Sequence, residues 1–102
     1  MRDFRLELEK DEDCFWLARR FNITEDLTIS IQANEFAYCL PRTKNDSYTD
    51  YFQLELGFPN FTPPDYIMEY ADDPDDPQET VYGYVPYELI QRMIDELRGA
   101  AC

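Results

Sequence analysis

Residues 86–99 read PYELIQRMIDELRG, and this stretch decides the fold class. Its apolar residues recur every three or four positions, at Leu89, Ile90, Met93, Ile94 and Leu97. That spacing is typical of a single apolar stripe along an α-helix. Pro86 suits the first helical position, and Gly99 is placed to end the helix. The pattern predicts a helix over residues 86–98 that lays its stripe on another layer of structure.

The other layer is predicted from the first half of the chain, residues 1–56. Alternation of apolar and polar residues, enrichment in aromatic residues and short lengths favour strands there. Strands are predicted over residues 3–9, 14–21, 27–31, 36–40 and 48–56, and the first two are expected to pair as a hairpin. The predicted fold class is therefore α+β. It comprises an antiparallel sheet of four to five strands with one C-terminal helix packed on a face, in a single domain of 102 residues.

Residues 57–80 differ in character from both layers. Prolines and a glycine predict an irregular, ordered segment with aromatic anchors. Within it, DYIMEY at residues 65–70 could form one helical turn or a short strand. It is followed by the tract YADDPDDPQET at residues 70–80, in which aspartates alternate with prolines and no basic residue occurs.

The charge of the chain is concentrated in one part of it. The formal net charge is −13, and residues 45–91 contain no lysine or arginine. The eleven acids of that segment are Asp46, Asp50, Glu55, Asp65, Glu69, Asp72, Asp73, Asp75, Asp76, Glu79 and Glu88. Ordinary protein surfaces intersperse both signs of charge, so this segment predicts a negative face that binds a basic protein.

The residues expected to bind that partner combine acids with tyrosines, which supply apolar contact area with a polar tip. They are Asp50, Glu55, Asp65, Tyr66, Glu69, Tyr70, Asp72, Asp73, Asp75, Asp76 and Glu79. Acids on a strand and on a proline-stiffened loop could also line up with lysines and arginines that normally hold phosphates, as in nucleic-acid mimicry. Two simpler alternatives stay open: the acids could be solvated surface, and Tyr66 and Tyr70 could cover the side of the sheet.

Several function classes are disfavoured by composition. The chain has no histidine, and no phosphate-binding or nucleophile motif occurs, so no enzyme, cofactor or metal site is expected. Such a negative chain repels phosphates, so direct binding to nucleic acid or to an anionic membrane is not expected. Three cysteines without paired spacing and the lack of a signal-peptide pattern favour the cytoplasm. The oligomeric state is left open.

A short, histidine-free, acidic chain whose residues 72–84 read DDPDDPQETVYGY resembles the small inhibitors that phages encode against bacterial defence, the anti-CRISPR and anti-restriction proteins. The resemblance is one of composition. It implies a stoichiometric inhibitor that occupies a DNA- or RNA-binding groove of a CRISPR effector or defence nuclease. Two alternatives fit the same composition: an immunity protein that neutralises a basic nuclease toxin, and an acidic adaptor in a larger assembly.

Overall fold

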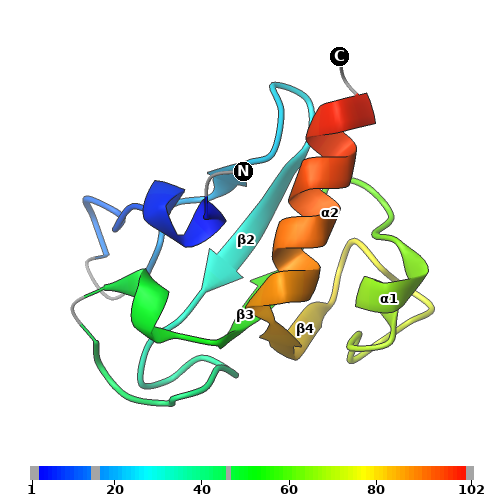
Figure 1. Cartoon of the computed structure of the whole chain (residues 1–102). Coiled ribbons are helices and arrows are strands. Elements are labelled where there is room, and N and C mark those ends of the chain that lie inside the picture. The colour runs from blue at the N-terminus through cyan, green and yellow to red at the C-terminus, as the bar shows by residue number, and fades with distance from the viewer. Residues whose placement is uncertain (1–2, 15–16, 46, 101–102) are drawn as a thin grey trace.

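One antiparallel sheet and a C-terminal helix form the frame of the molecule, as Figure 1 shows in the computed structural model, which describes residues 3–14, 17–45 and 47–100. The elements in chain order are η1 (Phe4–Glu7), β1 (Phe21–Asn22), β2 (Thr28–Gln32), η2 (Tyr48–Asp50), β3 (Gln53–Gly57), α1 (Asp65–Met68), β4 (Val81–Pro86) and α2 (Tyr87–Ala100). The expected α+β class, with four strands and the C-terminal helix, is confirmed.

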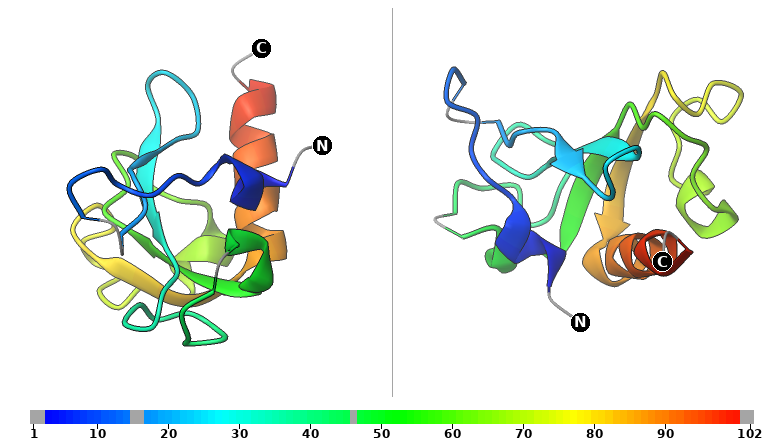
Figure 2. Two further views of the ribbon diagram at one scale, coloured as in Figure 1. Left: turned by 90° about the vertical axis from the view of Figure 1, so that its left-hand side faces the viewer. Right: turned by 90° about the horizontal axis from the view of Figure 1, so that it is seen from above.

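The sheet follows chain order, β1-β2-β3-β4, and every neighbouring pair is antiparallel. Helix α2 covers one face of it, and Figure 2 shows the two layers edge-on. The fully buried side chains that join them come from alternate positions of β3 and from the apolar stripe of α2: Leu54, Leu56, Ile90, Met93 and Ile94. The stripe read from the sequence therefore packs on the sheet as expected, although the helix begins at Tyr87 and Pro86 ends the preceding strand.

The first predicted strand is wrong, because residues 4–7 form the short 3-10 helix η1. The reason is local: the Asp3 side chain accepts a hydrogen bond from the Arg5 backbone N–H at 2.9 Å and caps the turn. The turn buries Phe4 completely and leaves Leu6 57% exposed, whereas a strand would have put both on one face. Phe4 packs edge-to-face on Phe21, with ring centroids 6.4 Å apart.

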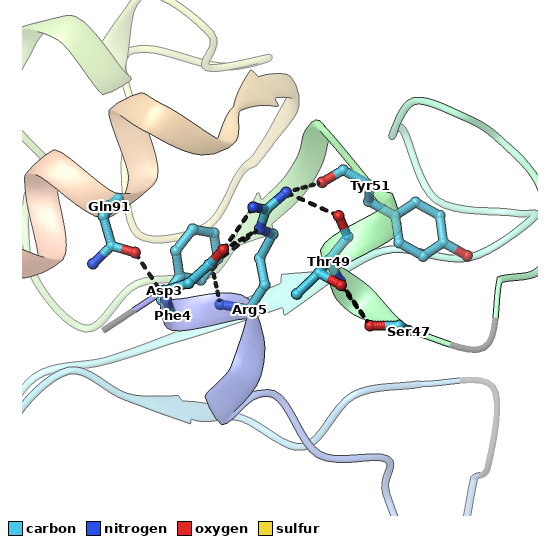
Figure 3. A network of polar contacts seen from close by, with 7 residues as sticks. All are labelled: Asp3, Phe4, Arg5, Ser47, Thr49, Tyr51 and Gln91. Atoms are coloured by element: carbon cyan, nitrogen blue, oxygen red, sulfur yellow. Dashed lines mark hydrogen bonds and ion pairs between the residues drawn. The ribbon is translucent and has the colours of Figure 1, made fainter. Parts of the chain in front are cut away.

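Arg5 ties this turn to the rest of the molecule, as Figure 3 shows. Its guanidinium pairs with Asp3 at 2.6 Å and donates to the carbonyl oxygens of Thr49 and Tyr51 at 3.2 and 2.8 Å. The Phe4 N–H donates to the Gln91 amide oxygen at 2.8 Å, which joins η1 to α2. Hydrogen bonding to Arg5 lowers the pKa of Asp3 below its ordinary value, so this pair stays ionised.

Other predicted strands are shorter than expected or absent. Residues 36–40 are a bent loop rather than a strand, because the Asn34 side-chain oxygen accepts from the N–H groups of Phe36 and Ala37 at 2.7 and 2.8 Å. Leu40 at the end of that loop forms an isolated bridge with Gln53. Residues 48–50 are the 3-10 helix η2, so the strand predicted over 48–56 begins at Gln53.

The predicted 14–21 strand is also largely wrong. Ala18 forms an isolated bridge with Lys10, which keeps part of the expected hairpin, and regular pairing starts only at Phe21. Residues 15–16 lie outside the described part of the chain. The prediction over 27–31, in contrast, is confirmed as β2 (Thr28–Gln32).

Strand β4 was not predicted at all, and it carries an irregularity. Leu54 and Leu56 of β3 pair with Val85 and Tyr82, so Glu55 lies opposite two residues of β4, Gly83 and Tyr84. Tyr84 takes a left-handed backbone conformation with a φ of 56°, which is uncommon for a residue other than glycine. The Tyr84 N–H leaves the strand pairing and donates to the Tyr38 carbonyl oxygen at 2.9 Å.

Candidate protein-binding surface

The long acidic segment of the sequence folds into two neighbouring pieces beside β4. Figure 1 shows α1 and the following loop on the same side of the molecule. We call residues 72–79 the acidic loop, and we call the seven exposed acids of the two pieces the acidic rim. The rim consists of Asp65, Glu69, Asp72, Asp73, Asp75, Asp76 and Glu79. Nine of the eleven residues expected to bind a partner, those from Asp65 to Glu79, are thus brought together.

The acidic loop is held at both ends by β4. The Asp72 N–H donates to the Val81 carbonyl oxygen at 3.0 Å, and the Asp73 N–H donates to the Thr80 hydroxyl at 2.9 Å. Thr80 is 5% exposed, and Tyr82, which is fully buried, donates its hydroxyl hydrogen to the Pro77 carbonyl oxygen at 2.5 Å. These bonds fix the loop within the folded chain, and a surface ordered in advance would lose less conformational entropy on binding.

Turns shape the interior of the loop. The Asp76 N–H donates to the Asp73 carbonyl oxygen at 3.2 Å, and the Glu79 N–H donates to the Asp76 carbonyl oxygen at 3.1 Å. The carboxylates are therefore spaced by a turning backbone and not by an extended strand. The strand-like repeat considered from the sequence does not apply to this loop, and its chemistry rests on the density of negative charge.

Replacing Tyr82 with phenylalanine tests this anchoring. The change leaves the net charge intact but removes the donor to Pro77, and loss of a hydrogen bond of this kind costs about 0.5–1.5 kcal/mol. We expect faster hydrogen exchange of the amides of Asp76 and Glu79, measured by NMR. Tyr84→Phe is the matched control, since Tyr84 is exposed and sits on the same strand. Equal protection in both variants would show that the Tyr82 hydroxyl does not hold the loop.

Among the described residues, no lysine or arginine forms an ion pair with the acidic rim, although Arg92 stacks on Tyr66 within the same region. Within residues 3–14, 17–45 and 47–100, the arginines pair elsewhere: Arg5 with Asp3, Arg19 with Glu9, Arg92 with Glu96 and Arg98 with Glu7. Arg20 donates to Thr28 and to the Phe58 carbonyl oxygen, and Arg42 donates to the Phe36 carbonyl oxygen. The negative field of the rim therefore extends into solvent.

The two tyrosines of this surface also have roles inside the protein. Tyr66 donates its hydroxyl hydrogen to Glu96 of α2, and the Arg92 guanidinium stacks over its ring at 4.2 Å from the centroid. Tyr70 is half-buried and packs against the core. Both therefore join the α1 region to the body of the protein and expose only part of their surface to a partner.

Tyr66 gives the stability of the protein a pH dependence. Burial, followed by the hydrogen bond to Glu96, raises the pKa of Tyr66 to about 12. In the unfolded chain a tyrosine ionises near pH 10, so this group contributes stability below about pH 10 that is lost as the pH rises toward 12. We expect the free energy of unfolding, measured in urea, to fall less steeply over that interval in Tyr66→Phe than in the wild type. Parallel curves from pH 8 to 12 would contradict this role.

Two of the residues expected to bind a partner lie away from the rim. Asp50 ends η2, which Figure 1 places at the opposite end of the molecule from α1. Glu55 lies on β3 and points to the face of the sheet that α2 does not cover, because its neighbours Leu54 and Leu56 are buried under the helix. Of the other two acids of residues 45–91, Glu88 is exposed in the first turn of α2, and Asp46 lies outside the described residues.

The described residues contain no group of three or more acidic or cysteine side chains arranged to hold a metal ion. No helix within them is long and apolar enough to cross a membrane. Comparison of the chain with family models, with curated proteins and with solved structures found no match. The surface geometry and charge are therefore the basis for a functional proposal.

Proposed function

We propose that this chain is a non-enzymatic, stoichiometric inhibitor whose acidic rim occupies a basic nucleic-acid-binding groove of a bacterial defence nuclease or CRISPR effector. One observation carries the proposal: seven exposed acids gather on one side of the molecule without an ion pair to any described cation. The partner that such a surface attracts is a protein with clustered lysines and arginines, and grooves that hold phosphates have that composition.

The anchoring of the acidic loop supports the same proposal. Uncompensated carboxylates repel one another and destabilise a compact state, so solvated surface needs no device to hold them together. Here backbone bonds to Val81 and Thr80 and the buried Tyr82 hydroxyl fix the loop against that repulsion. A pre-formed anionic surface binds a rigid cationic groove without first being ordered.

A competition experiment tests the proposal. The wild-type chain is immobilised and exposed to bacterial lysate at low salt, and the captured proteins are challenged with duplex DNA. We expect capture of a nucleic-acid-binding protein that duplex DNA displaces, with capture lost when the salt concentration is raised tenfold. The captured protein is then purified, and the chain should inhibit its DNA binding at a one-to-one ratio.

Two outcomes would contradict the proposed inhibition. Capture that duplex DNA cannot displace would mean that the rim does not occupy a nucleic-acid-binding groove. A captured protein whose DNA binding continues with the chain in twofold excess would mean that the chain is not an inhibitor of that kind.

A further inference from the structure

A second surface lies on the face of the sheet that α2 leaves uncovered. Four large side chains are exposed around Glu55, namely Leu17, Phe36, Tyr38 and Tyr84. We call them the aromatic face. Tyr38 and Tyr84 contact each other with ring centroids 5.9 Å apart, and the Tyr38 N–H donates to Glu55 at 3.0 Å. Phe36 is 69% exposed, and together the four side chains form an apolar patch in contact with water, which is a common feature of binding surfaces.

Gly83 explains how the loop over this face comes so near the sheet. A side-chain carbon added at Gly83 would lie 3.2 Å from the Tyr38 Cβ, so a larger residue there would have to push the loop back by a few tenths of an ångström. The irregular pairing of β4 turns the Tyr84 N–H toward the Tyr38 carbonyl oxygen. The left-handed backbone conformation of Tyr84 is unfavourable for a tyrosine. The hydrogen bonds of Tyr38 to the Tyr84 N–H and to Glu55 accompany it and hold the loop on the sheet.

A pocket of about 250 Å³ opens between this loop and the sheet. It is lined by Leu17, Gln32, Asn34, Phe36, Ala37 and Glu55. Sites for drug-sized ligands and cofactors enclose roughly 300–1,000 Å³. The pocket is below that range, and its size suits one amino-acid side chain.

Among the side chains that the structure describes around the pocket, one acceptor, on Glu55, has no hydrogen-bond partner. The Gln32 amide is fully engaged, since it accepts from the Ala18 N–H at 2.7 Å and donates to the Ala18 carbonyl and the Ser30 hydroxyl at 3.0 Å each. Glu55 uses Oε2 for the Tyr38 N–H, whereas its Oε1 has no hydrogen-bond partner among the residues that the structure describes. Apolar walls around one free carboxylate oxygen favour a group with an aliphatic stem and a cationic end.

We propose that this pocket receives a lysine or arginine side chain of the basic partner, with its stem against Leu17 and Phe36 and its charged end on Glu55 Oε1. The proposal rests on the proposed function for the partner's basic character, which the net charge of −13 also favours. The acidic rim attracts the partner, and the pocket adds a desolvated anchor of the kind that dominates binding energy. The protein already stacks an arginine on this face, since the Arg42 guanidinium lies 5.6 Å from the centroid of the Tyr38 ring.

Small cationic probes test the pocket without the partner. The isotope-labelled full chain is titrated with N-acetyl-arginine amide, N-acetyl-lysine amide and the neutral analogue N-acetyl-citrulline amide, and the amide resonances are followed by NMR. We expect saturable shifts at Leu17, Phe36, Ala37 and Tyr38 with one or both cations and none with citrulline. Shifts that occur only in residues 65–79, or equally with citrulline, would overturn the proposal.

Three variants sharpen the test. Glu55→Gln keeps an acceptor for the Tyr38 N–H but removes the charge, so affinity for the cation should fall about tenfold. Phe36→Ala removes one wall at an exposed position and should weaken binding about threefold. Arg42→Gln removes a competing positive charge and should strengthen binding. An unchanged affinity in Glu55→Gln, with an unchanged melting temperature, would also overturn the proposal.

The pocket and the acidic rim can fail separately. Asp72→Asn combined with Asp73→Asn should leave the pocket shifts nearly unchanged, because both residues lie in the acidic loop, outside the pocket lining. If duplex DNA does not displace the captured protein although the pocket binds the probes, the proposed function fails and the pocket stands. If displacement occurs but the probes do not bind, the pocket fails alone.

Discussion

Replacing Asp72, Asp73, Asp75 and Asp76 together with asparagine is expected to weaken binding to the captured partner by about tenfold to a thousandfold. Each exposed ion pair with the partner contributes a modest free energy, and four such contributions multiply in the dissociation constant. Asparagine removes the charge but keeps an acceptor. The Asp73 side chain accepts from the Asp75 N–H, and an amide oxygen can take over that role, whereas a charge-reversing lysine could not. The dissociation constant would be measured by calorimetry at two salt concentrations.

A matched variant carries the same change in charge away from the rim. Glu12, Asp13, Glu25 and Asp26 are exposed, and replacing them with the corresponding amides also adds four to the net charge. We expect this variant to bind within about threefold of the wild type, since only the long-range attraction changes. Equal losses in the two variants would mean that the partner senses total charge and not the acidic rim.

The two variants should differ little from the wild type in stability. The rim carboxylates make no ion pair with the described arginines, so their neutralisation removes repulsion without removing a bond. The melting temperature of the quadruple loop variant should therefore stay level or rise slightly. A fall of more than about 5 °C would indicate that the carboxylates support the fold.

Replacing Phe4 with alanine should have the largest effect on stability. The ring is fully buried against Phe21, and removal of a buried phenylalanine costs about 3–5 kcal/mol. That loss is a large part of the 5–15 kcal/mol typical of a folded protein, and it corresponds to a fall of about 12–40 °C in melting temperature. Calorimetry and urea titration would measure both quantities.

The neighbouring apolar residue provides a control that also decides the local structure. In a strand over residues 3–9, Phe4 and Leu6 would face the core together, and both alanine variants would be costly. In the 3-10 turn, Leu6 is exposed, so Leu6→Ala should change stability by less than about 0.5 kcal/mol. Similar losses in Phe4→Ala and Leu6→Ala would contradict the turn.

The elements that the sequence predicts well are those whose pattern and packing agree. The stripe of α2 and the alternation of β2 are both buried on one side, so periodicity identifies them. Two of the failures occur where a side chain competes for backbone hydrogen bonds. Asp3 caps η1 where apolar alternation had suggested a strand, and Asn34 captures the amides of Phe36 and Ala37 where the short apolar run FAYCL had suggested one.

Part of the candidate site was predictable because its residues are close together in the sequence. A run of acids along the chain stays together in space when it is consecutive, so residues 65–79 form one surface. Asp50 and Glu55 were separated from it by the sheet, whose pairing no composition can reveal. The aromatic face escaped prediction because it joins Leu17, Phe36 and Tyr84, which are far apart in sequence and meet only through the loop over β3 and β4.

The anchoring of the acidic loop on β4 has a further consequence for how the molecule behaves at high concentration. Strand β4 is the last in the sheet, and a terminal strand with free amides invites another chain to extend the sheet and start aggregation. Ala71 bridges to Tyr82 and Asp72 bonds to Val81, so the outer side of the first two residues of this strand is already occupied by a segment that leads into the acidic loop. The loop should thus also oppose self-association, and removing it with its five acids would expose this part of the strand and lower the magnitude of the net charge.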